Sequence, residues 1–402
     1  MSVRGGAAAL LLALAALPAA AQLTGGAIRI GVLTDISSLY ADGTGMGSVT
    51  AARMAVEDSG IERRGVKVEV LFADHLNKPD VGLTAARRWY DVDGVDVIVD
   101  VPNSSVALAV SQLTRDKNRV FLASGAGSSD LTGKACSPNT IHWAYDTWML
   151  ANATARYVTR AGFDTWFFVT ADYAFGHALE RDATAAIARD GGRSLGAVRV
   201  PLNNADFGSF LMQAQASKAK VIGLANAGAD ATTAMKQAAE FGLVKGGQRV
   251  AGLLMGLTDV HALGLATAQG LTMTEAFYWD ANDGTREFAR RFAPRHRGIH
   301  PNAIHAGVYS ALLHYFKAVE ASKSDADGAA IVARMKSMPT DDPLYGRGTI
   351  RADGRKIHPA YLVEVKKPAE SRGAWDYYKV VATIPAQDAF RPLAEGGCPL
   401  VR

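Results

Sequence analysis

Two short polar turns hold the residues whose types and spacing are best suited to chemistry. Ser104 and Ser105 follow the stretch 97–101, which is apolar apart from Asp100, and the turn 124–128, of sequence SGAGS, follows the apolar stretch 120–123. Such turns present backbone N–H groups and hydroxyls without bulky side chains, so they can hold an anionic group such as a carboxylate. Because small polar turns also serve as connectors and helix caps, these residues alone leave a ligand site and a simple N-cap both open.

The segments around these turns alternate between strand-like and helix-like patterns. Strands are predicted over 28–33, 66–72, 97–101, 120–123, 165–170, 194–200, 220–225, 249–255, 271–278, 361–366 and 377–383. Helices are predicted from Ser48, from Pro79 and after Ser105, and then over 149–161, 176–190, 207–217, 230–241, 285–297, 302–321 and 327–338. Continuous apolar strands alternating with helices are typical of parallel sheets covered by helices on both faces.

Three stretches interrupt this alternation, and each one predicts a crossing between two lobes. They lie near Tyr145, near Tyr278, and between Gly346 and Pro359. We therefore expect two doubly wound α/β lobes joined by a three-segment hinge, with 22–144 and 280–350 in lobe 1 and 145–279 and 351–402 in lobe 2. The strand ends of both lobes would face one cleft that closes around a ligand.

The chain ends carry signs of export. Residues 1–21 contain Arg4, a short apolar run and a small-residue stretch, as in a cleaved signal peptide, so we expect a periplasmic monomer. The only two cysteines, Cys136 and Cys398, lie too far apart in sequence for a CxxC motif, and a disulfide that ties down the C-terminal tail is expected. The formal net charge of +4 is small and scattered, which gives no reason to expect nucleic acid as a partner.

No catalytic or cofactor motif is present. The sequence lacks HExxH, GxSxG, the P-loop pattern and a calcium-loop pattern, and its histidines do not have the spacing of metal ligands. The glycines of 43–47 do not fit a dinucleotide-binding loop, because the preceding strand ends about ten residues earlier. We therefore expect a binding protein without catalytic activity, cofactor or metal.

Several stretches resemble one family throughout the chain after residue 21. They are IRIGVLTDISSLYADGTGMGSVTAARMAVED, VPNSSVALAV, FLASGAGSSDLT and FVTADYAFGHAL. These stretches resemble the periplasmic substrate-binding proteins of ABC transporters in the branched-chain amino acid (Leu/Ile/Val) class, which have a type I periplasmic-binding fold. The segments HWAYDTWMLAN and YWD are most similar to a subgroup that takes up aromatic or other organic acids.

The resemblance and the predicted strand ends together give a set of candidate ligand-binding residues. Ser104 matches the hydroxyl that holds a ligand carboxylate, the 124–128 turn matches the loop whose N–H groups complete that contact, and Tyr173 matches an aromatic residue of the second lobe. The full candidate set is Tyr40, Ser104, Ser105, Gly125, Ala126, Gly127, Ser128, Tyr145, Tyr173, Asn226, Ala227, Asp230, Met255 and Trp279. Asp230 could equally cap a helix, and Tyr145 and Trp279 could equally be hinge packing.

The residues around 254–258 bear on the chemistry of the ligand. Amino-acid binders of the family place a carboxylate here for the ligand's ammonium group, but this chain has no acid until Asp259. We therefore expect a monocarboxylate with an apolar, aromatic body and no α-amino group, delivered to an inner-membrane ABC permease. The alternatives are a branched-chain or related amino acid, with Asp259 or Asp230 as the ammonium partner, and a ligand-sensing domain that regulates a partner.

Overall fold

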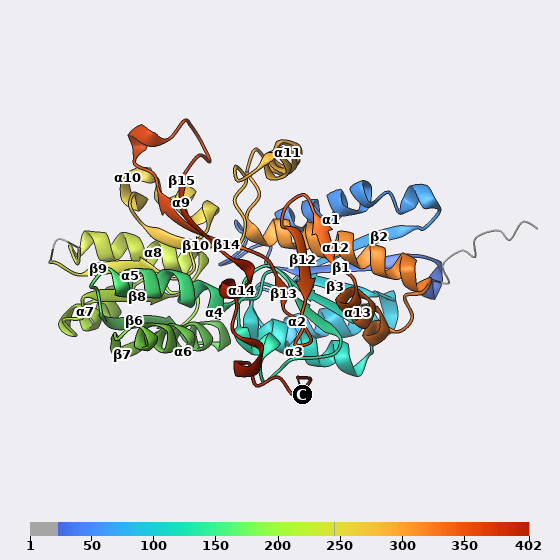
Figure 1. Cartoon of the computed structure of the whole chain (residues 1–402), viewed down its shortest axis with the longest axis horizontal. Coiled ribbons are helices and arrows are strands. Elements are labelled where there is room, and N and C mark those ends of the chain that lie inside the picture. Colours follow the sequence, from blue (N-terminus) through green and yellow to red (C-terminus); the bar gives the residue numbers. More distant parts are fainter. Residues whose placement is uncertain (1–22, 245, 402) are drawn as a thin grey trace, which may run out of the picture.

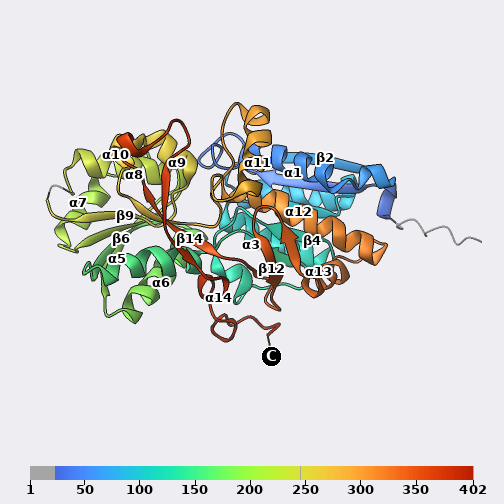
Figure 2. The same ribbon diagram turned by 45° about the horizontal axis from the view of Figure 1, so that its top comes forward.

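The structure is a computed structural model that describes residues 23–244 and 246–401. The predicted signal peptide lies outside this range. Two α/β lobes lie side by side along the longest axis of the molecule (Figure 1), and a view from another angle shows the same division (Figure 2). The predicted fold class, with two parallel sheets each covered by helices, is confirmed.

The first lobe is built on a five-stranded parallel sheet with the order β2-β1-β3-β4-β5. Its strands are β1 (Ile28–Thr34), β2 (Val68–Asp74), β3 (Val97–Asp100), β4 (Val120–Ala123) and β5 (Thr140–His142). Helices α1 (Gly45–Ser59), α12 (Ala303–Ser322) and α13 (Gly328–Ser337) pack together, whereas α2 (Pro79–Arg88) and α3 (Ser104–Asp116) form a separate layer. The central strands are buried on both faces, which explains why their sequences are apolar apart from Asp100 at the end of β3.

The second lobe has a four-stranded parallel sheet with the order β7-β6-β8-β9. Its strands are β6 (Thr165–Ala171), β7 (Arg193–Val200), β8 (Val221–Ala225) and β9 (Arg249–Gly252). The helices of this part are α4 (Thr147–Leu150), α5 (Arg156–Arg160), α6 (Ala174–Arg189), α7 (Gly208–Ala216), α8 (Gly228–Glu240), α9 (Leu257–Leu263) and α10 (Leu265–Ala268). In each lobe the strand order reverses beside the first strand, and ligands of open α/β sheets bind outside the carboxyl ends of the strands near such a point.

Two antiparallel sheets complete the fold, and the sequence did not predict them as sheets. One has the order β10-β14-β15, with strands β10 (Thr272–Glu275), β14 (Ala360–Val365) and β15 (Tyr378–Ile384). The other joins β11 (Thr340–Asp342), β12 (Gly346–Ile350) and β13 (Lys356–Ile357). Helix α11 (Asp283–Phe292) follows β10 along the chain, and the short helix α14 (Ala386–Ala389) precedes the C-terminal tail.

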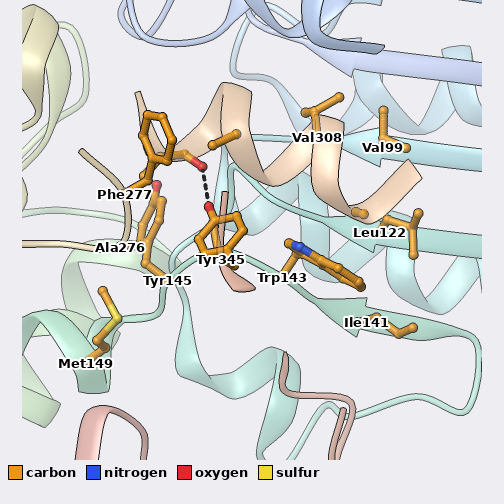
Figure 3. Packing of buried hydrophobic residues seen from close by; sticks show 14 of the residues in the cluster. Val99, Leu122, Ile141, Trp143, Tyr145, Met149, Ala276, Phe277, Val308 and Tyr345 are labelled. Atoms are coloured by element: carbon orange, nitrogen blue, oxygen red, sulfur yellow. Dashed lines mark hydrogen bonds between the residues drawn. The ribbon is translucent and has the colours of Figure 1, made fainter. Parts of the chain in front are cut away.

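We propose that the lobe boundaries lie at three connections between these sheets. They are the connection from β5 to α4, the connection from β10 to α11, and His358-Pro359 between β13 and β14. One apolar cluster runs through this region, from Val99 and Leu122 of the first sheet past Trp143 and Tyr145 to Met149 and Phe277 (Figure 3). The core of the first lobe is therefore continuous with the packing of the crossings.

The predicted disulfide between Cys136 and Cys398 is confirmed. It attaches the C-terminal tail to the loop after β4, and the Arg391 guanidinium donates to the Ser129 carbonyl at 3.2 Å in the same region. The tail also contacts the second lobe, because Arg189 pairs with Glu395 at 2.7 Å. The tail therefore joins elements of both lobes. Within the residues described, none of the helices has the length and apolar character needed to span a membrane.

Candidate functional site

A cavity of about 140 Å³ lies between the two lobes, where the loops that follow their strands meet. The first lobe contributes the loops after β1 and β4 and the start of α12, and the second lobe contributes the starts of α6, α8 and α9 and the end of β10. More than half of the lining residues are apolar or aromatic: Leu39, Tyr40, Pro102, Tyr145, Leu150, Tyr173, Phe175, Ala227, Ala229, Leu254, Met255, Ala262, Ala276, Ala303 and Ile304. Such a lining suits a small ligand with an apolar body.

The turn after β4, for which the sequence predicts an anion-binding role, is held by hydrogen bonds of its own. Ser104 is fully buried, and its Oγ accepts the N–H of Ser128 at 3.1 Å, which fixes the turn against the first residue of α3. Asn103 is the N-cap of that helix, because its side chain accepts the N–H groups of the next turn. The N–H groups of Ala126 and Gly127 donate to no residue of the part that the structure describes. Because Gly127 lines the cavity, its N–H is available to an anionic group there.

The absence of a side chain at Gly127 allows the second lobe to approach this turn. A Cβ atom at this position would lie 2.8 Å from the Phe175 ring and 3.2 Å from the Tyr145 ring. The hydroxyl of Tyr145 donates to the carbonyl of Gly125 at 2.7 Å, so this aromatic wall is attached to the turn itself. Gly127 thus leaves the space that the Phe175 and Tyr145 rings occupy.

A pair of tyrosines joins the lobes directly over the cavity. The hydroxyl groups of Tyr40 and Tyr173 lie 2.6 Å apart, and the N–H of Ala229 donates to the carbonyl of Leu39 at 3.2 Å. Burial raises the pKa of both phenols well above its ordinary value, so both stay neutral. Asn302, the N-cap of α12, donates its amide to the carbonyl of Gly43 at 2.8 Å and holds the loop that carries Tyr40.

The second lobe adds carboxyl groups to this otherwise apolar cavity. Glu275, the last residue of β10, is 6% exposed, and its Oε1 accepts the hydroxyl of Tyr378 at 3.0 Å. Burial raises the pKa of Glu275 to about 8. Asp259 accepts the N–H of Gly256 at 2.8 Å, and burial raises its pKa to about 6. The described lining also includes Asp42 and contains no Lys, Arg or His.

The cavity brings together half of the candidate residues from the sequence. Those that line it are Tyr40, Gly125, Gly127, Tyr145, Tyr173, Ala227 and Met255. Those that lie outside the lining are Ser104, Ser105, Ala126, Ser128, Asn226, Asp230 and Trp279. Ser104 and Ser128 still shape the turn through their mutual hydrogen bond, and the N–H of Ala126 belongs to the same turn.

Three candidates of the second lobe and the hinge have other contacts. Asp230 lies in the first turn of α8, and its carboxylate accepts the N–H groups of Asn203 and Asn204, each at 3.0 Å. Trp279 donates to the carbonyl of Trp375 at 2.8 Å, as expected for hinge packing. Asn226 is 1% exposed, and its amide has no hydrogen-bond partner among the described residues.

Glu275 is the main residue of the cavity that the sequence analysis missed. The stretch 254–258 contains no acid, but the cavity still has carboxyl groups, because Glu275 and Asp259 both line it. The sequence held a signal, since a glutamate interrupts an extended apolar run directly before the predicted second crossing. A charged residue in a strand that is buried at all four positions has a specific contact or a function.

Comparison with known proteins shows one family over most of the chain. Residues 27–373 match the family described as "Periplasmic binding protein". The crystal structure of a periplasmic binding protein from Burkholderia mallei is 46% identical, with a TM-score of 0.91, and the match covers 94% of this chain and 100% of that one.

Two further solved structures are of proteins described with a ligand or a ligand class. A branched chain amino acid ABC transporter periplasmic ligand-binding protein from Burkholderia xenovorans LB400 is 40% identical, with a TM-score of 0.81, over 93% of this chain and 99% of that one. A solute-binding protein of an ABC transporter from R. palustris, solved in complex with benzoate, is 20% identical, with a TM-score of 0.81, over 93% of this chain and 100% of that one. At that identity the second likeness shows the shared fold.

Proposed function

The chain belongs to the periplasmic binding protein family, whose members bind substrates and are not enzymes, and from this premise we propose that it captures a small carboxylate with an apolar body for an ABC importer. The ligand would sit between the two lobes, with its carboxylate at the 125–128 turn. The bound protein would then present the ligand to an inner-membrane permease.

The observation that carries this proposal is the combination of one polar turn with aromatic walls in a single cavity. Ala126 and Gly127 have free N–H groups, and Ser104 holds their turn in place. Tyr40, Tyr145 and Tyr173 surround the same space with flat, neutral rings. Since hydrogen bonds from N–H groups to a carboxylate are charge-assisted and the rings favour an apolar body, an aromatic acid is the first candidate ligand. The benzoate complex of the R. palustris protein supports the same choice.

A branched-chain or related amino acid is the second candidate. Glu275 and Asp259 could face an ammonium group, and the protein from Burkholderia xenovorans, 40% identical, is described as a branched chain amino acid transporter component. The expectation that the ligand lacks an α-amino group no longer follows, because it depended on the missing acid over 254–258. A ligand-sensing domain that regulates a partner protein is the third candidate. It differs from a transport protein in its partner and not in its cavity.

A ligand panel tests the proposal directly. We would purify the protein, remove bound ligand by unfolding and refolding, and record thermal shifts with aromatic acids, aliphatic acids and amino acids. A ligand at a hundred times its Kd should stabilise the folded state by about 2.7 kcal/mol, and calorimetry would then give its affinity. Binding only of compounds without a carboxylate would contradict the proposal, and exclusive binding of aliphatic amino acids would establish the second candidate.

A further inference from the structure

Asp100, the last residue of β3, lies directly behind the wall of the cavity. It is fully buried, and a Cβ atom at Gly125 would lie 2.4 Å from its Oδ1 atom. Gly125 and Pro102 both belong to the cavity lining, whereas Asp100 does not. The carboxyl group of Asp100 therefore lies against the turn at which we place the ligand carboxylate, on the side away from the cavity.

The backbone at Asp100 has a conformation that most residues avoid. Asp100 has a φ angle of 79° and Val101 has one of 57°, in the left-handed region that is a genuine outlier for a β-branched residue such as valine. The N–H of Val101 donates to the carbonyl of Leu33 at 2.9 Å, and the N–H of Gly125 donates to the carbonyl of Asp100 at 3.2 Å, so the neighbouring segments hold this conformation. Strained residues cluster at functional sites, and here one of them carries a buried acid.

The carboxyl group of Asp100 has no fixed partner. Within residues 23–244 and 246–401, neither of its oxygens forms a hydrogen bond, and the Oγ atom of Ser48 is also buried without a partner. The hydroxyls of Ser48, in the first turn of α1, and of Thr34, at the end of β1, lie beside the carboxyl group. Because a hydroxyl can donate to a carboxylate and accept from a carboxylic acid, this site can hold Asp100 with or without a proton.

The surroundings of Asp100 disfavour its ionised form. Burial raises its pKa to about 7, and the nearby acid Asp35 acts in the same direction. Tyr145, after β5, is the other titratable group near it, and burial keeps this phenol neutral. The first turn of α1 and the turn after β4 consist of uncharged residues. Among the residues that the structure describes, no cation therefore offsets a charge on Asp100.

We propose that Asp100 is a positioning residue that has to be protonated before the 125–128 turn accepts a carboxylate, so that ligand capture is linked to the uptake of a proton. The inference rests on the proposed function, because it assumes that the ligand carboxylate occupies this turn. Two carboxylates on either side of the Gly125 backbone would repel each other where little water screens them, and one proton on Asp100 removes that repulsion. The proton comes from the solvent, and only the O–H bond of Asp100 forms.

Calorimetry in two buffers with different ionisation enthalpies measures the proton uptake. The probes are benzoate and leucine, whose carboxylates stay ionised between pH 6 and pH 8. Since the pKa of Asp100 is about 7 in the free protein and rises on binding, we expect uptake of about half a proton at pH 7 and nearly one at pH 8. The Kd should increase by roughly fivefold between pH 7 and pH 8.

Asp100→Asn keeps the shape of the side chain but cannot take up a proton. Its Kd should change by less than about twofold over the same range, with no proton uptake. Asp96→Asn is the matched control, because Asp96 is a buried acid directly before the same strand whose pKa burial also raises to about 7. It accepts the N–H of Arg29 at 2.8 Å and lies outside the cavity lining, so this variant should keep the proton uptake of the unmodified protein.

The contrary results separate the inference from the proposed function. Binding without proton uptake, or uptake that persists in Asp100→Asn because another acid such as Glu275 takes the proton, would overturn the inference while the proposed function stands. If Asp100→Asn does not fold, Ser48→Ala removes a hydroxyl that lowers the pKa of Asp100, so it should move the onset of uptake to higher pH, and an unchanged onset would overturn the inference. If neither benzoate nor leucine binds at any pH, both the inference and the proposed function fail.

Discussion

We expect Gly127→Ala to weaken ligand binding by preventing full closure of the lobes. In the closed arrangement the new Cβ atom would lie 2.8 and 3.0 Å from two carbons of the Phe175 ring and 3.2 Å from the Tyr145 ring. Carbon atoms in contact prefer about 3.5–4.0 Å, so at least one group has to move by close to 1 Å. Phe175 is 2% exposed, which leaves its ring little room to turn away.

The magnitude follows from the ordinary cost of overpacking. An added methyl group in a well-packed core raises the free energy by about 1–3 kcal/mol. If the lobes separate in the ligand-free protein, the clash is present only in the bound, closed state, so the whole amount reduces affinity. The expected loss is about 5–150-fold in Kd. The free energy of unfolding of the ligand-free protein should change by less than about 0.5 kcal/mol, as for a substitution without a folded-state contact.

A matched variant separates this effect from a general effect of alanine. Gly43→Ala also adds a Cβ atom to the cavity lining, but its nearest neighbours lie at 3.5 Å, an ordinary contact distance. Calorimetry with the best acid of the panel gives Kd for both variants, and small-angle scattering gives the radius of gyration with and without ligand. Gly127→Ala with an affinity and a bound radius equal to those of the unmodified protein would refute the reasoning.

Three further predictions concern stability. Ser104→Ala should lower the free energy of unfolding by about 1–3 kcal/mol in urea titrations, because the N–H of Ser128 loses its acceptor, and unchanged stability would contradict this role. The denatured, unreduced protein should show no free thiol, and reduction of Cys136–Cys398 should lower stability, by at most about 5 kcal/mol in the chain-entropy model. The pKa of Glu275 is raised to about 8 in the folded state, so the folded protein binds an extra proton and its free energy of unfolding falls as pH rises from about 5 to 8. The free energy of unfolding of Glu275→Gln should fall less over that range. If both proteins show the same slope of this free energy against pH, the raised pKa is contradicted.

The strands and the small-residue turn after β4 could be predicted because their signals are local. Parallel strands that are buried on both faces have mostly apolar sequences, and β3 and β4 show this over residues 97–100, apart from Asp100, and 120–123. The small residues after β4 leave the N–H groups of Ala126 and Gly127 without an acceptor among the residues that the structure describes. Asn103 caps α3, as the polar stretch 103–105 indicated.

The place of Glu275 in the cavity could not be predicted from the sequence, because it depends on contacts between distant segments. The side chain of Glu275 faces the cavity only because β10 pairs with β14, which begins at Ala360, and because Tyr378 of β15 holds Oε1. The sequence over 272–275 alternates threonine with Met273 and Glu275, a pattern typical of a half-exposed strand, whereas all four residues are buried. For the same reason the sequence showed Ser104 as a ligand contact and not as the acceptor for Ser128.

The way in which the crossings are joined bears on how the two lobes can close. Arg355 donates to the carbonyl of Tyr145 at 3.0 Å, and His358 contacts the carbonyl of Ala144 at 2.7 Å, so side chains next to the third crossing hold the backbone of the first. Backbone carbonyls that are buried and bonded in this way resist independent movement of the two segments. The lobes should then close along one path, which brings the second lobe to a fixed distance from the turn around Gly127. A ligand too short to contact both lobes would leave one of them without a contact, and closure would then lose part of its driving force.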